Sequence, residues 1–98
     1  MPFKHRYDLA RHFVRHGEEV GAATADEYER RADAFMTGPL QKGALECVRP
    51  NGDRLRFDPT TQEFGVLVKA GHIATFMIAK PLPNSSQTSL QYFRSKCR

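Results

Sequence analysis

Two histidines stand four residues apart in the segment RHFVRHG, which spans residues 11–17. Residues at positions i and i+4 share one face of a helix, so His12 and His16 are expected to lie together. An arginine precedes each histidine, so the segment combines groups that titrate near neutral pH with groups that bind anions. Three roles fit: a solvated or structural helix surface, half of a metal site, and the acid-base and phosphate-binding part of a nuclease.

A zinc site has the weakest support of these three roles. In HExxH metalloproteases a glutamate directly follows the first histidine and acts as general base, whereas Phe13 follows His12 here. No third ligand is evident, because His5 belongs to the same expected helix and His72 to an expected turn. We therefore expect no metal and no cofactor. A structural role, in which one histidine caps or bridges and the other is solvated, stays open.

Ribonuclease chemistry uses the residue types that this chain supplies. Cleavage without a metal needs a group that takes the proton from the ribose 2′-OH, a group that protonates the departing 5′ oxygen, and cations near the phosphate. Histidine suits both proton transfers because its pKa lies near neutral pH. The candidates are two acid-base residues, one hydroxyl and four cations: His12, His16, Thr75, Arg15, Arg54, Arg56 and Lys80. Most basic domains contain such residues, so this set alone does not identify a ribonuclease.

The composition indicates one small globular domain. The chain has 98 residues, of which 40% are hydrophobic and 27% charged, as in ordinary soluble proteins. No apolar run approaches the roughly 18 residues of a membrane span, and the N-terminus lacks the apolar region of a signal peptide. The net charge is +4, with bases in excess in 1–16 and 39–98 and acids in excess in 17–38. If the two basic parts meet in space, they form an anion-attracting surface.

Two helices are expected in the first part of the chain. Residues 5–16 contain no Gly or Pro, and Gly17 gives a natural end; the expected apolar stripe consists of Leu9, Phe13 and Val14. Thr24 and Glu27 form a capping-box pattern in front of a second helix at about 25–37. Apolar residues recur along one face of that helix, at Tyr28, Ala32, Phe35 and Met36.

After the second helix the apolar period changes from about four to two, which predicts strands at 44–49, 54–57, 64–68 and 73–78. An Asn-Gly pair at 51–52 is a strong hairpin signal. In the second strand, Leu55 and Phe57 are expected to face the core, and Arg54 and Arg56 to face outward. We therefore predict an α+β fold, in which two N-terminal helices pack on a four-stranded antiparallel meander whose arginine face is open.

The expected domain covers residues 1–81, and residues 82–98 are expected to form a C-terminal extension or docking tail. Residues 81–89 have the composition of a linker, and the segment 90–98 mixes aromatic with basic residues. Cys47 and Cys97 have no CxxC spacing. They are predicted to be reduced and structurally minor, with a disulfide between them as the open alternative.

The order of these segments resembles a known family. Its pieces are RHG at the end of the first helix, TADEY at the start of the second, then RLRFDPTTQEFGV, GHIATF and KP. Together they resemble the C-terminal toxin domains of Rhs-type and contact-dependent-inhibition polymorphic toxins. More distantly, the chain is similar to the tRNA-cleaving domain of colicin D, one of the small bacterial ribonucleases that include barnase. The chain departs from the family pattern at TFMIAKP, where the family usually has a shorter ending similar to TFFKP.

The resemblance implies a metal-independent endoribonuclease that cleaves tRNA by 2′-OH attack and leaves a 2′,3′-cyclic phosphate. It implies that His16 is the acid-base residue, that Arg15 contacts phosphate and that Thr75 is a hydroxyl of the site. His12 matches an earlier histidine of the Rhs-type domains, and Lys80 the lysine of the usual ending. The expected RNA- and phosphate-binding residues are Arg15, Arg54, Arg56 and Lys80.

The resemblance also implies partners and a place of action. The expected partners are RNA, above all tRNA, and a cognate immunity protein or another protein. The expected site of action is the cytoplasm, including that of a target bacterial cell into which such a toxin is delivered. The chain contains no delivery module, which suits an excised toxin domain or a free-standing phage or mobile-element protein. The alternative is a non-enzymatic phage or mobile-element protein that inhibits a nucleic-acid-processing complex, with the aromatic and basic segment 90–98 as its docking part.

Overall fold

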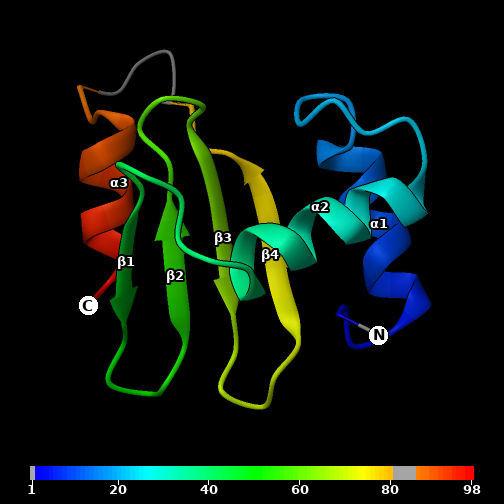
Figure 1. Cartoon of the computed structure of the whole chain (residues 1–98), viewed down its shortest axis with the longest axis horizontal. Helices are drawn as coiled ribbons and strands as arrows, with labels where there is room; N and C mark the ends of the chain where they lie inside the picture. Colours follow the sequence, from blue (N-terminus) through cyan, green and yellow to red (C-terminus); the bar gives the residue numbers. More distant parts are fainter. Residues whose placement is uncertain (1, 81–85) are drawn as a thin grey trace.

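The computed structural model describes residues 2–80 and 86–98 and shows an α+β fold (Figure 1). Its elements are α1 (Arg6–His16), α2 (Ala25–Thr37), β1 (Leu45–Val48), β2 (Arg54–Phe57), β3 (Glu63–Leu67), β4 (Ile73–Ile78) and α3 (Ser89–Lys96). The four strands form one antiparallel sheet in the order β1-β2-β3-β4. The predicted pair of N-terminal helices and the four-stranded meander are therefore confirmed. The predicted boundary between residues 81 and 82 lies outside the described residues.

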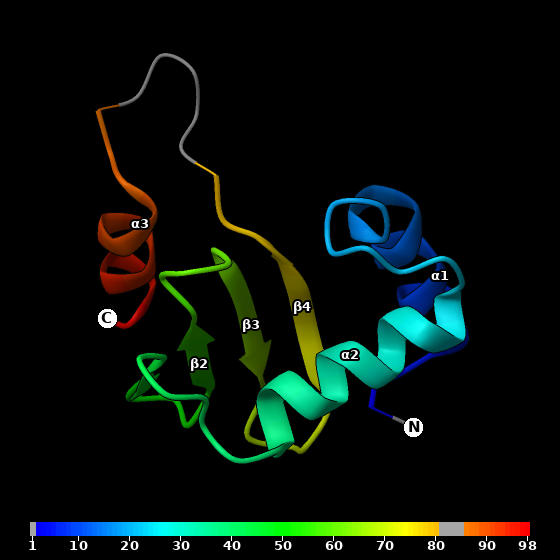
Figure 2. The same ribbon diagram turned by 45° about the horizontal axis from the view of Figure 1, so that its top comes forward.

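The helices cover both faces of the sheet. Helix α2 crosses one face and contacts β2, β3 and β4, while α1 packs against α2 and β4 (Figures 1 and 2). Helix α3 packs against β2 on the opposite face, where Phe93 stacks on Phe57. The prediction that one sheet face is open is therefore wrong. None of the helices within the described residues is long and apolar enough to span a bilayer.

Helix α2 follows from its sequence at both ends and along its buried side. The Thr24 side chain accepts a hydrogen bond from the backbone N–H of Glu27, as predicted, and the Glu27 carboxylate accepts one from Ala23 N–H. The helix ends at Gly38, where a Cβ would lie 2.5 Å from the carbonyl oxygen of Ala34. The four residues of the predicted apolar stripe are all buried: Tyr28, Ala32, Phe35 and Met36.

Two hydrophobic clusters lie on opposite sides of the sheet. The first joins α1, α2 and β4 and includes Phe3, Leu9, Tyr28, Met36 and Phe76. The second lies under α3 and includes Leu55, Phe57, Phe64 and Phe93. Both faces of the sheet are therefore covered by helices, and each cluster fills one side of it. The predicted stripe of α1 is correct for Leu9 and Phe13 but wrong for Val14, which is 83% exposed.

The outer edge of β4 is occupied by groups from the N-terminal part of the chain. Ile73 N–H donates to the carbonyl of Pro2, the hydroxyl of Tyr28 donates to the carbonyl of Phe76, and Ile78 N–H donates to the Glu19 carboxylate. Burial, and next the charge of Glu19, raise the pKa of Tyr28, so its hydroxyl stays a donor. These contacts satisfy backbone groups that an edge strand otherwise leaves unpaired.

The C-terminal segment belongs to the packed structure. Thr88 caps α3 with a complete capping box in which Gln91 takes part, and Phe93 is buried against the sheet. A disulfide joins Cys97, at the end of α3, to Cys47 of β1. The prediction of reduced, structurally minor cysteines is therefore wrong. The disulfide fixes the far end of the helix that covers the second cluster.

A candidate acid-base site on helix α1

The predicted histidine pair lies on the side of α1 that turns toward β4. The rings of His12 and His16 are 6.1 Å apart between centroids, and both side chains are half-buried. The ring of Phe3 lies 5.5 Å from that of His12 and covers it from the N-terminal side. The helix therefore presents two imidazoles side by side at the margin of the first hydrophobic cluster.

His16 faces a carboxylate that the sheet holds in place. Its Nδ1 lies 3.2 Å from Glu19 Oε2, a distance that fits an ion pair although the geometry does not meet that of a hydrogen bond. The same Oε2 accepts a 2.7 Å hydrogen bond from the backbone N–H of Ile78. The edge of β4 thus orients Glu19, and Glu19 in turn lies beside the His16 ring.

His12 lies in a less polar setting than His16. Its Nδ1 is buried and has no hydrogen-bond partner among the described residues. Burial lowers the pKa of His12, and the positive charges of His16, Arg15 and Arg11 lower it further, while Asp8 opposes them. This shift favours the neutral form of His12, in which an imidazole can accept a proton.

Three cations adjoin the histidines. Arg11 and Arg15 flank His12 and line with it a small pocket of about 50 Å³. Arg15 also lines a larger open hollow of about 410 Å³ together with Glu18, Glu19 and Lys80. The structure therefore places three of the predicted site residues, His12, Arg15 and His16, together on α1, and Lys80 lines the hollow that Arg15 and Glu19 share. Lys80 lies on the side of His16 and Glu19, despite the longer ending that precedes it in the sequence.

Thr75 is not part of this group. It pairs with Val66, which pairs with Leu55, so these three share the sheet face covered by α3. Its neighbour Phe76 faces the opposite side and belongs to the cluster around α1 and α2. Thr75 lines neither the pocket at His12 nor the hollow at Lys80.

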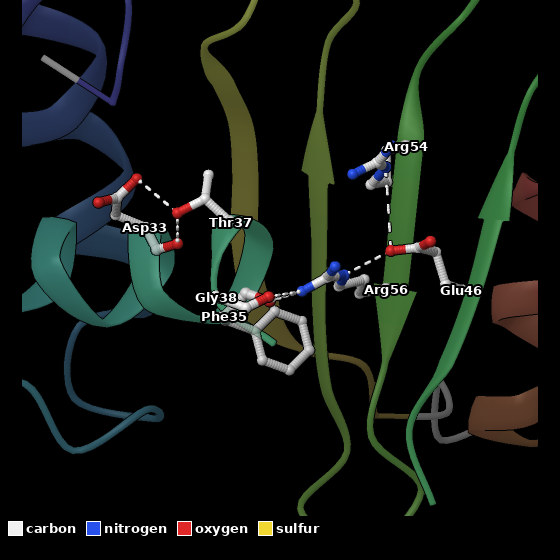
Figure 3. Close-up of polar contacts among 7 residues, drawn as sticks. All are labelled: Asp33, Phe35, Thr37, Gly38, Glu46, Arg54 and Arg56. Atoms are coloured by element: carbon white, nitrogen blue, oxygen red, sulfur yellow. Dashed lines mark hydrogen bonds and ion pairs between the residues drawn. The ribbon is translucent and has the colours of Figure 1, made fainter. Parts of the chain in front are cut away.

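Arg56 has a structural environment that differs from the predicted outward one. Only 8% of it is exposed, and Nε donates to Glu46 at 2.6 Å. Its Nη1 donates to the backbone carbonyls of Phe35 at 3.1 Å and Gly38 at 2.6 Å (Figure 3). Arg56 thus connects the C-terminal end of α2 to β1, and the prediction that it faces outward is wrong.

Arg54 is the exposed member of the β2 pair. Its side chain is 45% exposed, and its Nε lies 3.8 Å from the Glu46 carboxylate (Figure 3). Strands β3 and β4 separate it from α1 in the sheet order. The structure therefore brings neither β2 arginine to the histidine pair.

Glu19 is the residue of this site that sequence reasoning missed. It lies in the segment that was expected to be only a connection between two helices. The available signal was its spacing, because a carboxylate three residues after a histidine at a helix end can reach the imidazole. Its bond to Ile78, 59 residues away, depends on the tertiary fold.

Within residues 2–80 and 86–98, no three side chains of His, Cys, Asp or Glu form a group that could hold a metal ion. The sequence matches no protein-family model. No curated protein shows significant similarity to it.

Proposed function

We propose that this protein is an endoribonuclease whose acid-base groups are His12 and His16. The observation that carries the proposal is the pairing of two differently placed imidazoles on one helix. One is half-buried, has a lowered pKa and is flanked by Arg11 and Arg15, and the other lies beside a carboxylate held by the sheet edge. Two titratable groups in contrasting environments suit a base and an acid that act in one reaction.

The proposed reaction is an intramolecular transesterification, in which the phosphoryl group passes from the 5′ oxygen of one nucleotide to the 2′ oxygen of the nucleotide before it. His12 takes the proton of the ribose 2′-OH as the 2′ oxygen forms a bond to phosphorus, and His16 gives a proton to the 5′ oxygen as its bond to phosphorus breaks. Glu19 orients the His16 ring and complements its positive charge. Arg11 and Arg15 line the pocket with His12, Lys80 lines the hollow beside Glu19, and these cations would stabilise the charge on the phosphorane. The products are a 2′,3′-cyclic phosphate and a 5′-hydroxyl.

The sequence resemblance to polymorphic-toxin domains favours tRNA as the substrate and an immunity protein as the partner, with action in the cytoplasm. The alternative of a non-enzymatic inhibitor drew its support from the missing delivery module and from the aromatic and basic segment 90–98. In the structure Phe93 is buried, and Leu90 and Tyr92 pack against the second cluster, so these side chains serve the fold. The proposed docking part therefore loses its aromatic side chains, which weakens this alternative relative to the ribonuclease.

The test is incubation of total tRNA with the purified protein in EDTA, followed by gel analysis. We expect wild type to cleave, and His16→Ala to lose about 100-fold or more of the rate, as for removal of a general acid or base. His5→Ala is the matched control, because His5 precedes α1, is exposed and makes no capping hydrogen bond. The proposal fails if wild type does not cleave, or if His16→Ala cleaves as fast as His5→Ala.

A further inference from the structure

The outer side of α1 carries exposed apolar residues that have no role in the fold. Tyr7 is 70% exposed and Val14 is 83% exposed, and both lie on the face opposite the buried Leu9. Five side chains of this face line an open hollow of about 350 Å³: Tyr7, Ala10, Arg11, Val14 and Arg15. We call it the outer hollow. A contiguous exposed apolar patch rimmed by polar residues marks an interaction site.

The outer hollow adjoins the acid-base site through two shared arginines. Arg11 and Arg15 line the outer hollow on one side and the small pocket at His12 on the other. The guanidinium of Arg11 also lies 5.7 Å from the centre of the Tyr7 ring, so it covers one part of a ring that stays accessible. Across the surface of α1, the Tyr7 ring is therefore followed by the two arginines and then by His12.

We infer that the outer hollow binds an unpaired base of single-stranded RNA, next to the phosphate at which His12 and His16 transfer protons. This inference rests on the proposed function and names the form of its substrate. The base stacks on Tyr7 and contacts Val14, while Arg11 and Arg15 hold the phosphate between the base and His12. A base within a duplex does not expose its flat face, so the strand must be unpaired at this nucleotide.

Charge and shape favour nucleic acid over a protein as the occupant. The outer hollow combines an apolar floor with two arginines. A nucleotide offers a flat aromatic base that fits the apolar floor and a phosphate that fits the arginines. The N-terminal part of the chain around it is basic, with Lys4 and Arg6 also exposed. The two shared arginines place the outer hollow next to the pocket at His12.

The first test measures binding without cleavage. A fluorescent single-stranded 2′-fluoro RNA of mixed sequence lacks the attacking 2′-OH, and an abasic strand of equal length keeps the phosphates but lacks bases. Stacking of one base on an aromatic ring corresponds to about a fivefold change in affinity or more. We expect Tyr7→Ala to weaken binding of the 2′-fluoro strand by at least that factor and to leave binding of the abasic strand unchanged.

A second pair of variants tests the apolar floor. Val14→Ser should weaken binding of the 2′-fluoro strand, whereas Val48→Ser should not, because Val48 is similarly exposed but lies on β1. The chain has no Trp, so Tyr7→Trp introduces a single tryptophan. Its fluorescence should be quenched by the 2′-fluoro strand and not by the abasic strand.

The results that overturn the inference are distinct from those that overturn the ribonuclease. Equal affinity of wild type, Tyr7→Ala and Val14→Ser for the 2′-fluoro strand overturns it, even if RNA is cleaved. A wild-type dimer in sedimentation that Val14→Ser converts to a monomer also overturns it, because a second copy then covers this face. Base-dependent binding that requires Tyr7 supports the inference, even if cleavage is never found and the proposed reaction is wrong.

Discussion

Replacing Arg56 by methionine is expected to lower the free energy of unfolding by about 3 kcal/mol. Methionine has a stem of similar length but no donors, so the carbonyls of Phe35 and Gly38 lose their partner and the Glu46 carboxylate loses its closest cation. Removing one member of a buried ion pair typically costs about 3 to 5 kcal/mol, and Glu46 is still partly exposed, so we expect the lower end. Arg54→Met should cost about 1 kcal/mol at most, because the ion pair of Arg54 with the same carboxylate is exposed.

Thermal and urea unfolding of the two variants measure this difference. About 3 kcal/mol corresponds to a fall in Tm of about 12 °C or more for a domain of this size. Binding of RNA should keep its salt dependence in Arg56→Met, because a guanidinium with internal partners contacts no phosphate. The reasoning is refuted if Arg56→Met unfolds within about 0.5 kcal/mol of wild type, or if Arg54→Met is the less stable of the two.

Two further predictions concern the disulfide and the pH dependence of stability. Cys97→Ser opens a loop of 50 residues, and loop-closure entropy predicts that the free energy of unfolding falls by about 4 kcal/mol. Equal free energies of unfolding in urea for this variant, reduced wild type and oxidised wild type would contradict this prediction. Because the pKa of His12 is lowered in the folded state, the unfolded chain binds the proton more readily. Stability should therefore be complete above about pH 6.5 and decline as the pH falls from there toward the folded pKa. His12→Gln should reduce this decline in urea titrations between pH 7 and pH 5, and an unchanged decline would count against the assignment.

Much of the fold follows from local patterns in the sequence. The stripe of α2 and the Thr24 cap predict that helix almost to the residue, and the alternation in β2 and β3 predicts the meander. The sequence does not predict which alternate residues of β4 face α1 and α2, because IATFMI carries apolar residues on both sides of the strand. The position of Thr75 depends on this choice. One orientation of β4 would turn Thr75 toward α1 and α2, whereas the observed register places it on the sheet face that α3 covers.

The rest required knowledge of contacts between distant segments. Arg56 alternates with apolar residues as an exposed arginine would, and only the carbonyls at the end of α2 show that it points inward. The pairing of Cys47 with Cys97 depends on α3 returning to the sheet. The histidine pair was predictable from its spacing of four residues. The spacing of Glu19 shows that it can reach His16, but only the fold shows that β4 orients it.

The chemical nature of the cut ends tests the central proposal most directly. A single RNA substrate and a copy with a 2′-O-methyl group at the cleaved position are incubated with wild type in EDTA, and the products are identified by mass spectrometry. The proposal predicts a 2′,3′-cyclic phosphate and a 5′-hydroxyl from the unmodified strand, and no cut in the methylated one. A 5′-phosphate product, or cleavage of the methylated strand at the same position, would contradict 2′-OH attack assisted by His12 and His16.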